Sequence, residues 1–193
     1  EFITIASTGN STDFGADLTV ARYGMAPGSN GTRGIFAGGS HTPSGPQSDT
    51  IDYITMQSTG VAAQDFGNLT AGRQYPAGSF CSSTRQIIAA GQTPTNISDM
   101  NFITMSTLGN GADFGDLANG NRNQNCGGIS SNSIRGITMA GSDGSGLTLH
   151  IEYVTISTLG DAQDFGDLSS TGSNGALSAS STRAVRLGNA SPS

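Results

Sequence analysis

A short pattern with an aromatic residue followed by a β-branched or long apolar residue and threonine occurs four times in this chain. The aromatic residues stand at positions 2, 53, 102 and 153, so successive copies are 51, 49 and 51 residues apart. An Asp-Phe-Gly triplet follows in every copy, and an arginine then opens a second strand-like stretch. These markers keep one order in all four copies, and a repeat of this kind is one supersecondary unit packed on its neighbours.

Each unit reads as strands. In residues 51–56, apolar side chains fall on both faces of an extended chain, so the sheet must be covered on both sides. Glycine and asparagine interrupt every candidate helical period. A unit of about 50 residues with about four short strands has the size of a propeller blade. We therefore expect an all-β fold, a β-propeller of four blades in a single domain over residues 1–193.

The ends of the chain fit this reading. Three blades would span about residues 20–69, 70–117 and 118–168. The fourth would join residues 169–193, as its inner strands, to residues 1–19, as its outer strands. Sharing one sheet between the two termini leaves no exposed edge, so we expect a closed ring. A piece of a larger ring, or a half-ring completed by a second chain, has the same register.

The strand that ends in Gly38-Gly39, followed by a variable loop, an aromatic strand and an arginine, resembles a kelch-type blade. The fuller pattern is similar to the kelch-like repeats in tail-fibre-like virion proteins of marine cyanobacterial phages. Only the first copy has both glycines, since the others read Ala90-Gly91, Ala140-Gly141 and Gly188-Asn189. The resemblance implies a virion or extracellular location, and partners among other virion proteins or host-surface glycans and proteins.

Charge excludes some partners. The chain has no lysine, eight arginines and a net charge of −6, with a sequence pI near 4.5. Nucleic-acid binding by phosphate neutralisation therefore does not fit, and no apolar stretch approaches a membrane span. We expect no nucleic-acid partner and no membrane insertion, whereas a homo-oligomer is compatible with the sequence.

Aspartate and arginine recur equally often in the repeats. A ring of arginines repels itself unless each meets a carboxylate, so we expect the two sets to pair structurally. An arginine ring that binds an anionic ligand is the alternative. The expected pairs come from Asp13, Asp65, Asp113 and Asp164 with Arg33, Arg85, Arg135 and Arg183.

Loops that differ between copies mark the expected binding face, at residues 40–50, 92–99 and 142–150. Two tyrosines, each just after an arginine, are the aromatic residues nearest these loops. The candidate ligand-binding residues are therefore Arg22, Tyr23, Arg73 and Tyr75.

No catalytic or metal-binding constellation stands out, because Asp-Phe-Gly occurs without the other motifs of a protein kinase. We expect no cofactor and no enzyme activity. The resemblance implies a non-enzymatic adhesion module of a tail fibre or tail-associated protein that contacts the host through its loops. An architectural or self-assembling propeller without a host ligand is the alternative, and a polysaccharide-active enzyme fits less well.

Overall fold

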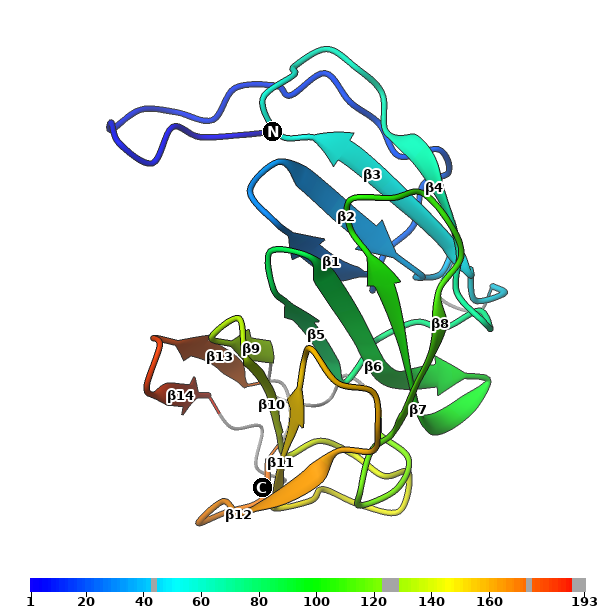
Figure 1. Cartoon of the computed structure of the whole chain (residues 1–193), viewed down its shortest axis with the longest axis vertical. Helices are drawn as coiled ribbons and strands as arrows, with labels where there is room; N and C mark the ends of the chain where they lie inside the picture. Colours follow the sequence, from blue (N-terminus) through cyan, green and yellow to red (C-terminus); the bar gives the residue numbers. More distant parts are fainter. Residues whose placement is uncertain (43–44, 123–128, 173–174, 189–193) are drawn as a thin grey trace.

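The computed structural model describes residues 1–42, 45–122, 129–172 and 175–188 (Figure 1). Every regular element in this part of the chain is a β-strand, so the all-β class is confirmed. Of the two cysteines in the chain, Cys81 is half-buried and Cys126 lies outside the described residues. Asn189, which stands at the second glycine position of the fourth copy, also lies outside them.

Three sheets have four antiparallel strands each, in chain order, and a fourth sheet has two strands. The first sheet contains β1 (Ala26–Ser29), β2 (Arg33–Ala37), β3 (Thr50–Thr55) and β4 (Gln64–Asn68). The second contains β5 (Gly78–Cys81), β6 (Arg85–Thr93), β7 (Thr95–Thr104) and β8 (Ala112–Asp116). The third contains β9 (Ile129–Ser131), β10 (Arg135–Met139), β11 (His150–Thr155) and β12 (Gln163–Asp167). The last pair is β13 (Ala176–Ala179) and β14 (Ala184–Leu187).

The Asp-Phe-Gly triplets form β-bulges in the three complete sheets. Opposite Ile51 and Asp52, for example, the ladder pairs Gly67 and Asp65 and leaves Phe66 as the extra residue. The same shift occurs in β8 and β12. The glycines of these three bulges have φ values of +145°, +132° and +133°, a region that side chains rarely adopt. Phe66 and Phe114, at the first two of these bulges, are buried in the apolar layers between sheets.

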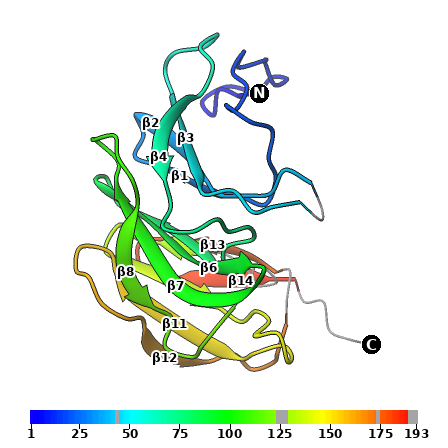
Figure 2. The same ribbon diagram turned by 90° about the vertical axis from the view of Figure 1, so that its right-hand side faces the viewer.

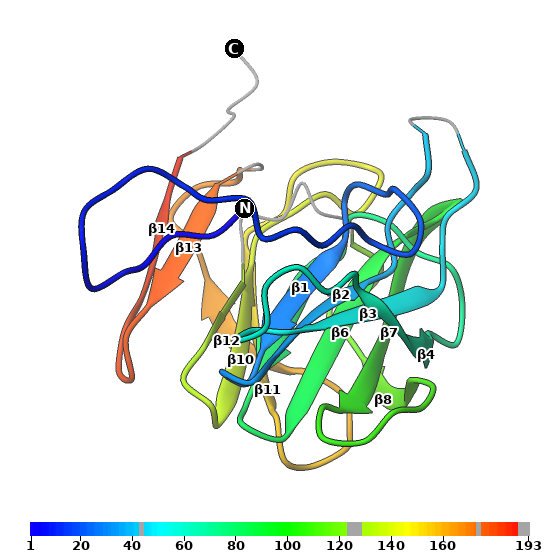
Figure 3. The ribbon, with the colours of Figure 1, turned by 90° about the horizontal axis from the view of Figure 1, so that it is seen from above.

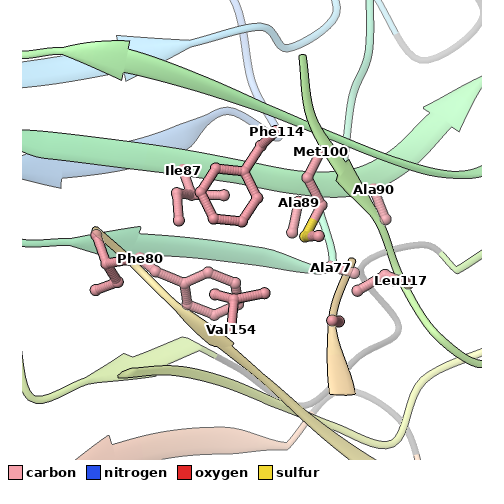
Figure 4. Close-up of a cluster of buried hydrophobic side chains, with 11 residues drawn as sticks. Ala77, Phe80, Ile87, Ala89, Ala90, Met100, Phe114, Leu117 and Val154 are labelled. Carbon is pink, nitrogen blue, oxygen red and sulfur yellow. The ribbon is translucent and has the colours of Figure 1, made fainter. Parts of the chain in front are cut away.

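The sheets follow one another as blades do. The first strands β1, β5, β9 and β13 lie side by side in chain order, and Figure 1 shows the sheets arranged along an arc. The apolar core therefore consists of layers between sheets. One layer joins Phe80, Ile87, Met100 and Phe114 of the second sheet to Val154 of the third (Figure 4).

The closed four-bladed ring is not formed by the described strands. Residues 1–19 make a bridge between Phe2 and Thr12 and pack on the first sheet. Strand β14 pairs with β13, and the pairings of the described residues do not join it to residues 1–19. In the described residues the structure shows three four-stranded sheets, a two-stranded sheet near the C-terminus, and a first segment that contains one isolated bridge.

The bulge glycines lead to a first prediction. A methyl group added to Gly67 would lie 2.5 Å from the Gly109 carbonyl oxygen of the next sheet, whereas one added to Gly31, also at positive φ, would meet nothing within 4 Å. We expect Gly67→Ala to lower the free energy of unfolding by about 3 kcal/mol or more, and Gly31→Ala by about 1 kcal/mol. Urea denaturation measures both, and equal losses would show that the sheets are not packed this closely.

Candidate functional site

The variable loops lie at one rim of the arc. A meander that begins at this rim returns to it between its second and third strands and again when it passes to the next sheet. The β2–β3, β6–β7 and β10–β11 connections therefore share the rim with the segments that lead into β1 and β5. Two bridges tie these parts together, from Tyr23 to Ser40 and from Gln74 to Gln92. Figure 2 shows the β2–β3 connection and the tip of the β6–β7 hairpin on the same side of the molecule.

Beneath this rim, each complete sheet holds an arginine paired with a carboxylate. Arg22 Nη2 lies 3.0 Å from Asp52 Oδ2, and both side chains are fully buried. Arg122 pairs in the same way with Glu152, which is also fully buried. Burial of this kind requires additional hydrogen bonds to offset the lost hydration. Arg22 donates to the Gly38 carbonyl from Nε.

The carboxylates also hold the chain segment that enters from the preceding sheet. Asp52 accepts hydrogen bonds from the backbone and hydroxyl of Thr19 at 3.2 and 2.7 Å. Glu152 accepts from the backbone N–H groups of Ala118 and Asn119 at 3.2 and 2.8 Å. One buried acid therefore fixes both an arginine of the rim and the crossover between two sheets.

The second sheet reaches the same result with different residues. Asn101 stands at the position of Asp52 and Glu152, and its amide oxygen accepts from Thr70. The negative charge comes from Asp99, whose Oδ2 lies 2.6 Å from Arg73 Nη2. Residues two apart in a strand lie on the same face. Asp99 therefore supplies the negative charge for Arg73 and Asn101 accepts from Thr70, whereas in the other two sheets one acid performs both functions.

These contacts correct the sequence prediction for two of the four ligand candidates. Arg22 and Arg73 are buried, and their guanidinium groups are used by Asp52, Asp99 and backbone carbonyls. They support the rim from below and are not presented to a ligand. Arg122 stands at the same place in the third copy as Arg22 and Arg73 do in the first two, and the spacing of these arginines in the sequence could have identified it.

Among the described residues, the Asp-Phe-Gly aspartates form no ion pair with the second set of arginines, unlike the pairing that the repeat suggested. The carboxylates of Asp13, Asp65 and Asp113 accept hydrogen bonds from the N–H of the glycine two residues later. Short aspartate side chains commonly cap their own backbone in this way. Asp164 lies opposite Glu152 in the β11–β12 ladder, and Arg183 lies in the turn between β13 and β14.

The second set of arginines instead clamps neighbouring sheets. Arg33, Arg85 and Arg135 lie over the rings of Tyr53, Phe102 and Tyr153 at 5.0, 4.5 and 4.6 Å from the ring centres. Two of them also reach the next sheet. Arg33 donates to the Met105 carbonyl at 2.8 Å, and Arg85 donates to the Ile156 carbonyl at 2.9 Å. A planar cation can stack on a ring and donate in its own plane, which lysine cannot do.

The two tyrosine candidates are brought together. The rings of Tyr23 and Tyr75 lie 5.8 Å apart, and both side chains are half-buried at the rim. Hydrogen bonding with Tyr23 raises the pKa of Tyr75 above its usual value, and burial acts in the same direction. The Tyr75 phenol is therefore neutral at physiological pH. The Tyr23 hydroxyl is buried, so the pair offers the rim a half-buried aromatic surface.

The loops of the rim contact one another. The Asn96 side chain, near the start of β7 at the tip of the β6–β7 hairpin, donates to the Ser142 carbonyl in the β10–β11 connection at 3.1 Å. In the next turn, Asp143 accepts from the N–H groups of Ser145 and Gly146, and these bonds lower the pKa of its carboxyl group. The carboxylate is exposed and charged. The described part of this rim is thus polar and internally hydrogen-bonded.

Other chemistry at the surface is sparse in the part of the chain that the structure describes. His150 lies 3.3 Å from the Asp167 carboxylate, and both are exposed. The described residues contain no group of three or more side chains that could hold a metal ion. Among them there is also no helix that could cross a lipid bilayer.

The buried pairs lead to a second prediction. Asp52→Asn and Glu152→Gln each leave a buried guanidinium without a counter-charge, so each should lower the free energy of unfolding by about 3–5 kcal/mol. The exposed Asp49→Asn is the matched control and should change it by less than about 0.5 kcal/mol. Urea denaturation with a circular-dichroism readout compares the three, and losses under 1 kcal/mol at the buried sites would refute the role given to these pairs.

Models of known protein families were compared with the chain, and none matches. A search of curated proteins also finds no match.

Proposed function

We propose that this chain is a non-enzymatic binding module of the β-propeller type, which contacts a host surface through the loops of the rim. The observation that carries the proposal is the contrast between the rim and its support. The loops differ in sequence from copy to copy, whereas the arginine–carboxylate pairs beneath them recur in each complete sheet. A rigid scaffold that presents variable polar loops is the usual design of a binding surface.

The propeller arrangement is the part of the proposal that concerns the fold. It rests on the meander order within sheets and on the neighbouring first strands β1, β5, β9 and β13. Residues 169–193 would supply the inner strands of the fourth blade, and residues 1–19 its outer strands. The aromatic pair Phe2 and Phe14, 6.0 Å apart, supports this because Tyr53 with Phe66 and Phe102 with Phe114 have the same geometry in complete sheets.

Glycans are the ligand class that this rim fits best. Sugar hydroxyls require many hydrogen-bonding groups and at least one aromatic surface for their apolar faces. The described rim loops consist mainly of serine, threonine, glycine and asparagine, and the Tyr23–Tyr75 pair lies among them. The similarity of the repeat to kelch-like phage virion proteins supports a place in a tail fibre, outside the cell, with a host glycan or protein as the partner.

An architectural module is the second candidate, and a specific observation favours it. Large apolar side chains are exposed at both ends of the arc, including Ile3, Ile5, Phe165 and Leu187. Surfaces of this kind mark contacts with protein. A polysaccharide-active enzyme has less support, because glycoside hydrolysis requires two available carboxylates and Asp52, Asp99 and Glu152 are engaged by arginines.

A third prediction tests the binding face. We expect the fluorescently labelled chain to bind a subset of bacterial cells and their isolated surface polysaccharides. Replacing Thr93 and Thr95 by alanine, or replacing Asp143–Gly146 by an unrelated turn, should weaken that binding at least tenfold, because hydrogen-bonding groups leave the rim. Ser83→Ala, in the β5–β6 turn at the opposite rim, is the control and should bind normally. Uniform absence of binding by the folded chain would favour the architectural module.

A further inference from the structure

The contacts between sheets repeat from joint to joint. At each joint, the carbonyl of an Asp-Phe-Gly phenylalanine accepts a hydrogen bond from a glycine N–H of the next unit. The pairs are Phe14 with Gly60 at 2.7 Å, Phe66 with Gly109 at 2.9 Å, and Phe114 with Gly160 at 2.8 Å. The next members of this series are Phe165, at the end of the third sheet, and Gly9, in the first segment of the chain. Each of them lies at an open end of the arc.

Exposure at the two ends shows that, among the described residues, no neighbour covers them in the single chain. Phe66 and Phe114 are 3% and 2% exposed, whereas Phe165 is 54% exposed. Ile5 corresponds to Met105 and Ile156, each three residues after the repeat's aromatic position. Those two are 0% and 1% exposed, and Ile5 is 95% exposed. The same positions of the repeat are therefore core inside the arc and surface at its ends.

At the N-terminal end, a cavity of about 440 Å³ lies between residues 1–19 and the first sheet. Its walls include Phe2, Phe14, Phe36, Ile54 and Met56. Phe36, Ile54 and Met56 correspond to Ile88, Ile103 and Met105 of the second sheet, which pack against Ile35 and Ala37 of strand β2 in the first.

Strand β14 carries the side chains that would fill this cavity. By its place in the repeat, Val185 of β14 corresponds to Ile35, and Leu187 corresponds to Ala37. Both are exposed where they stand, Leu187 by 71%. The lining of the cavity thus corresponds to one side of a joint whose other side β13 and β14 would supply.

At the C-terminal end, the complementary partner is missing. Arg135 lies over Tyr153 as Arg33 and Arg85 lie over their rings, and by the same pattern its acceptor would be the carbonyl of Ile5. A smaller cavity of about 110 Å³ lies between Arg135, Phe165 and Ala184. The C-terminal end therefore fits residues 1–19, and the N-terminal end fits β13 and β14.

Within one chain these two halves are held apart. β13 packs beside β9, and residues 1–19 are bonded to the first sheet through Phe14 and Asp17. Figure 1 shows residues 1–19 at the top of the arc and β13–β14 at its lower left, and Figure 3 shows both on the same side when seen from above. Each half is fixed by the same contacts that set the other joints.

We propose that the two ends of one chain are joined by the two ends of a second copy, giving a head-to-tail dimer. Each new blade consists of β13–β14 of one protomer and residues 1–19 of its partner. Propellers typically have four to eight blades. Among rings closed between copies, two copies give eight blades, within this range, whereas three would give twelve. Contacts of this head-to-tail kind close into a ring when the rotation per subunit allows it.

This inference rests on the propeller arrangement of the proposed function but not on ligand binding at the rim. The dimer proposal and the rim-binding proposal can therefore be refuted independently. A chain that binds glycans as a monomer refutes the dimer alone, and a dimer that binds no cell surface refutes the rim proposal alone.

The first test is the mass of the chain in solution. Light scattering at micromolar concentration should give twice the 19.5 kDa of one chain. Leu187→Asp places a charge where the cavity of the partner must be filled, so it should yield a folded monomer, since Leu187 is exposed in the single chain. Leu108→Asp, at an exposed leucine away from both ends, is the matched control and should remain a dimer. A monomeric native chain, or a polymer whose mass rises with concentration, would overturn the proposal.

The second test is a disulfide across the new blade. Gly34 pairs with Ile54, Gln86 with Ile103 and Gly136 with Val154, so the same register joins Ala184 to Ile3. With Cys81 and Cys126 replaced by serine, Ile3→Cys protein mixed with Ala184→Cys protein should form a covalent dimer on mild oxidation. Ser7→Cys in place of Ile3→Cys is the mismatched control and should form far less.

The variant with both Ile3→Cys and Ala184→Cys in one chain distinguishes the two ways of closing the fourth blade. A dimer gives a covalent dimer from this variant. A cross-linked monomer would show that each chain closes on itself, and it would overturn the second copy while supporting a four-bladed ring.

Discussion

The pairing of a buried arginine with a carboxylate at each crossover is the interaction on which the described structure depends most. Strands β3 and β11 carry Asp52 and Glu152 into the interior, where each charge must find an opposite charge and further donors, whereas in β7 the buried Asn101 is joined by the partly exposed Asp99. The arginine supplies the charge, and the segment arriving from the preceding sheet supplies the donors. One polar contact therefore fixes where each sheet begins relative to the one before it. Because the pair lies directly beneath the variable loops, it also gives them a rigid base.

Packing between sheets follows from the same repetition. Every apolar layer takes one face from each of two neighbouring sheets, as the contact of Phe80, Met100 and Phe114 with Val154 shows. No sheet can bury both of its faces alone, so stability is shared among joints as in other repeat proteins. The bulge glycines permit the backbones to approach closely at these joints. The consequence is that the first and last units must leave apolar surface uncovered unless something continues the series.

The extended segments predicted around residues 33–39 and 51–56 contain strands β2 and β3. Residues 92–99, expected as a loop, belong instead almost entirely to β6 and β7, and the buried arginines pair with other acids than the repeat suggested. Two arginines occur in each of the first three copies, and an aspartate in Asp-Phe-Gly is the most visible acid in every copy. That aspartate caps its own turn, and the acid used for pairing is the less conspicuous residue before the aromatic position. Alternation along a strand would have placed Asp52 and Glu152 on an inward face. The substitution of Asn101 with Asp99 in the second sheet hides the pattern from a simple comparison of copies.

By itself, the sequence determined the all-β class and the period of the repeat, because these follow from local alternation and from spacing along the chain. Only the tertiary structure decided which acid meets which arginine, that Tyr23 and Tyr75 lie together, and that residues 1–19 and β14 stand at opposite ends of an arc. Those outcomes depend on the rotation from one sheet to the next and on which side chains cross a joint. Neither quantity is encoded in the spacing of residues, since the same repeat can close within one chain or remain open for a second.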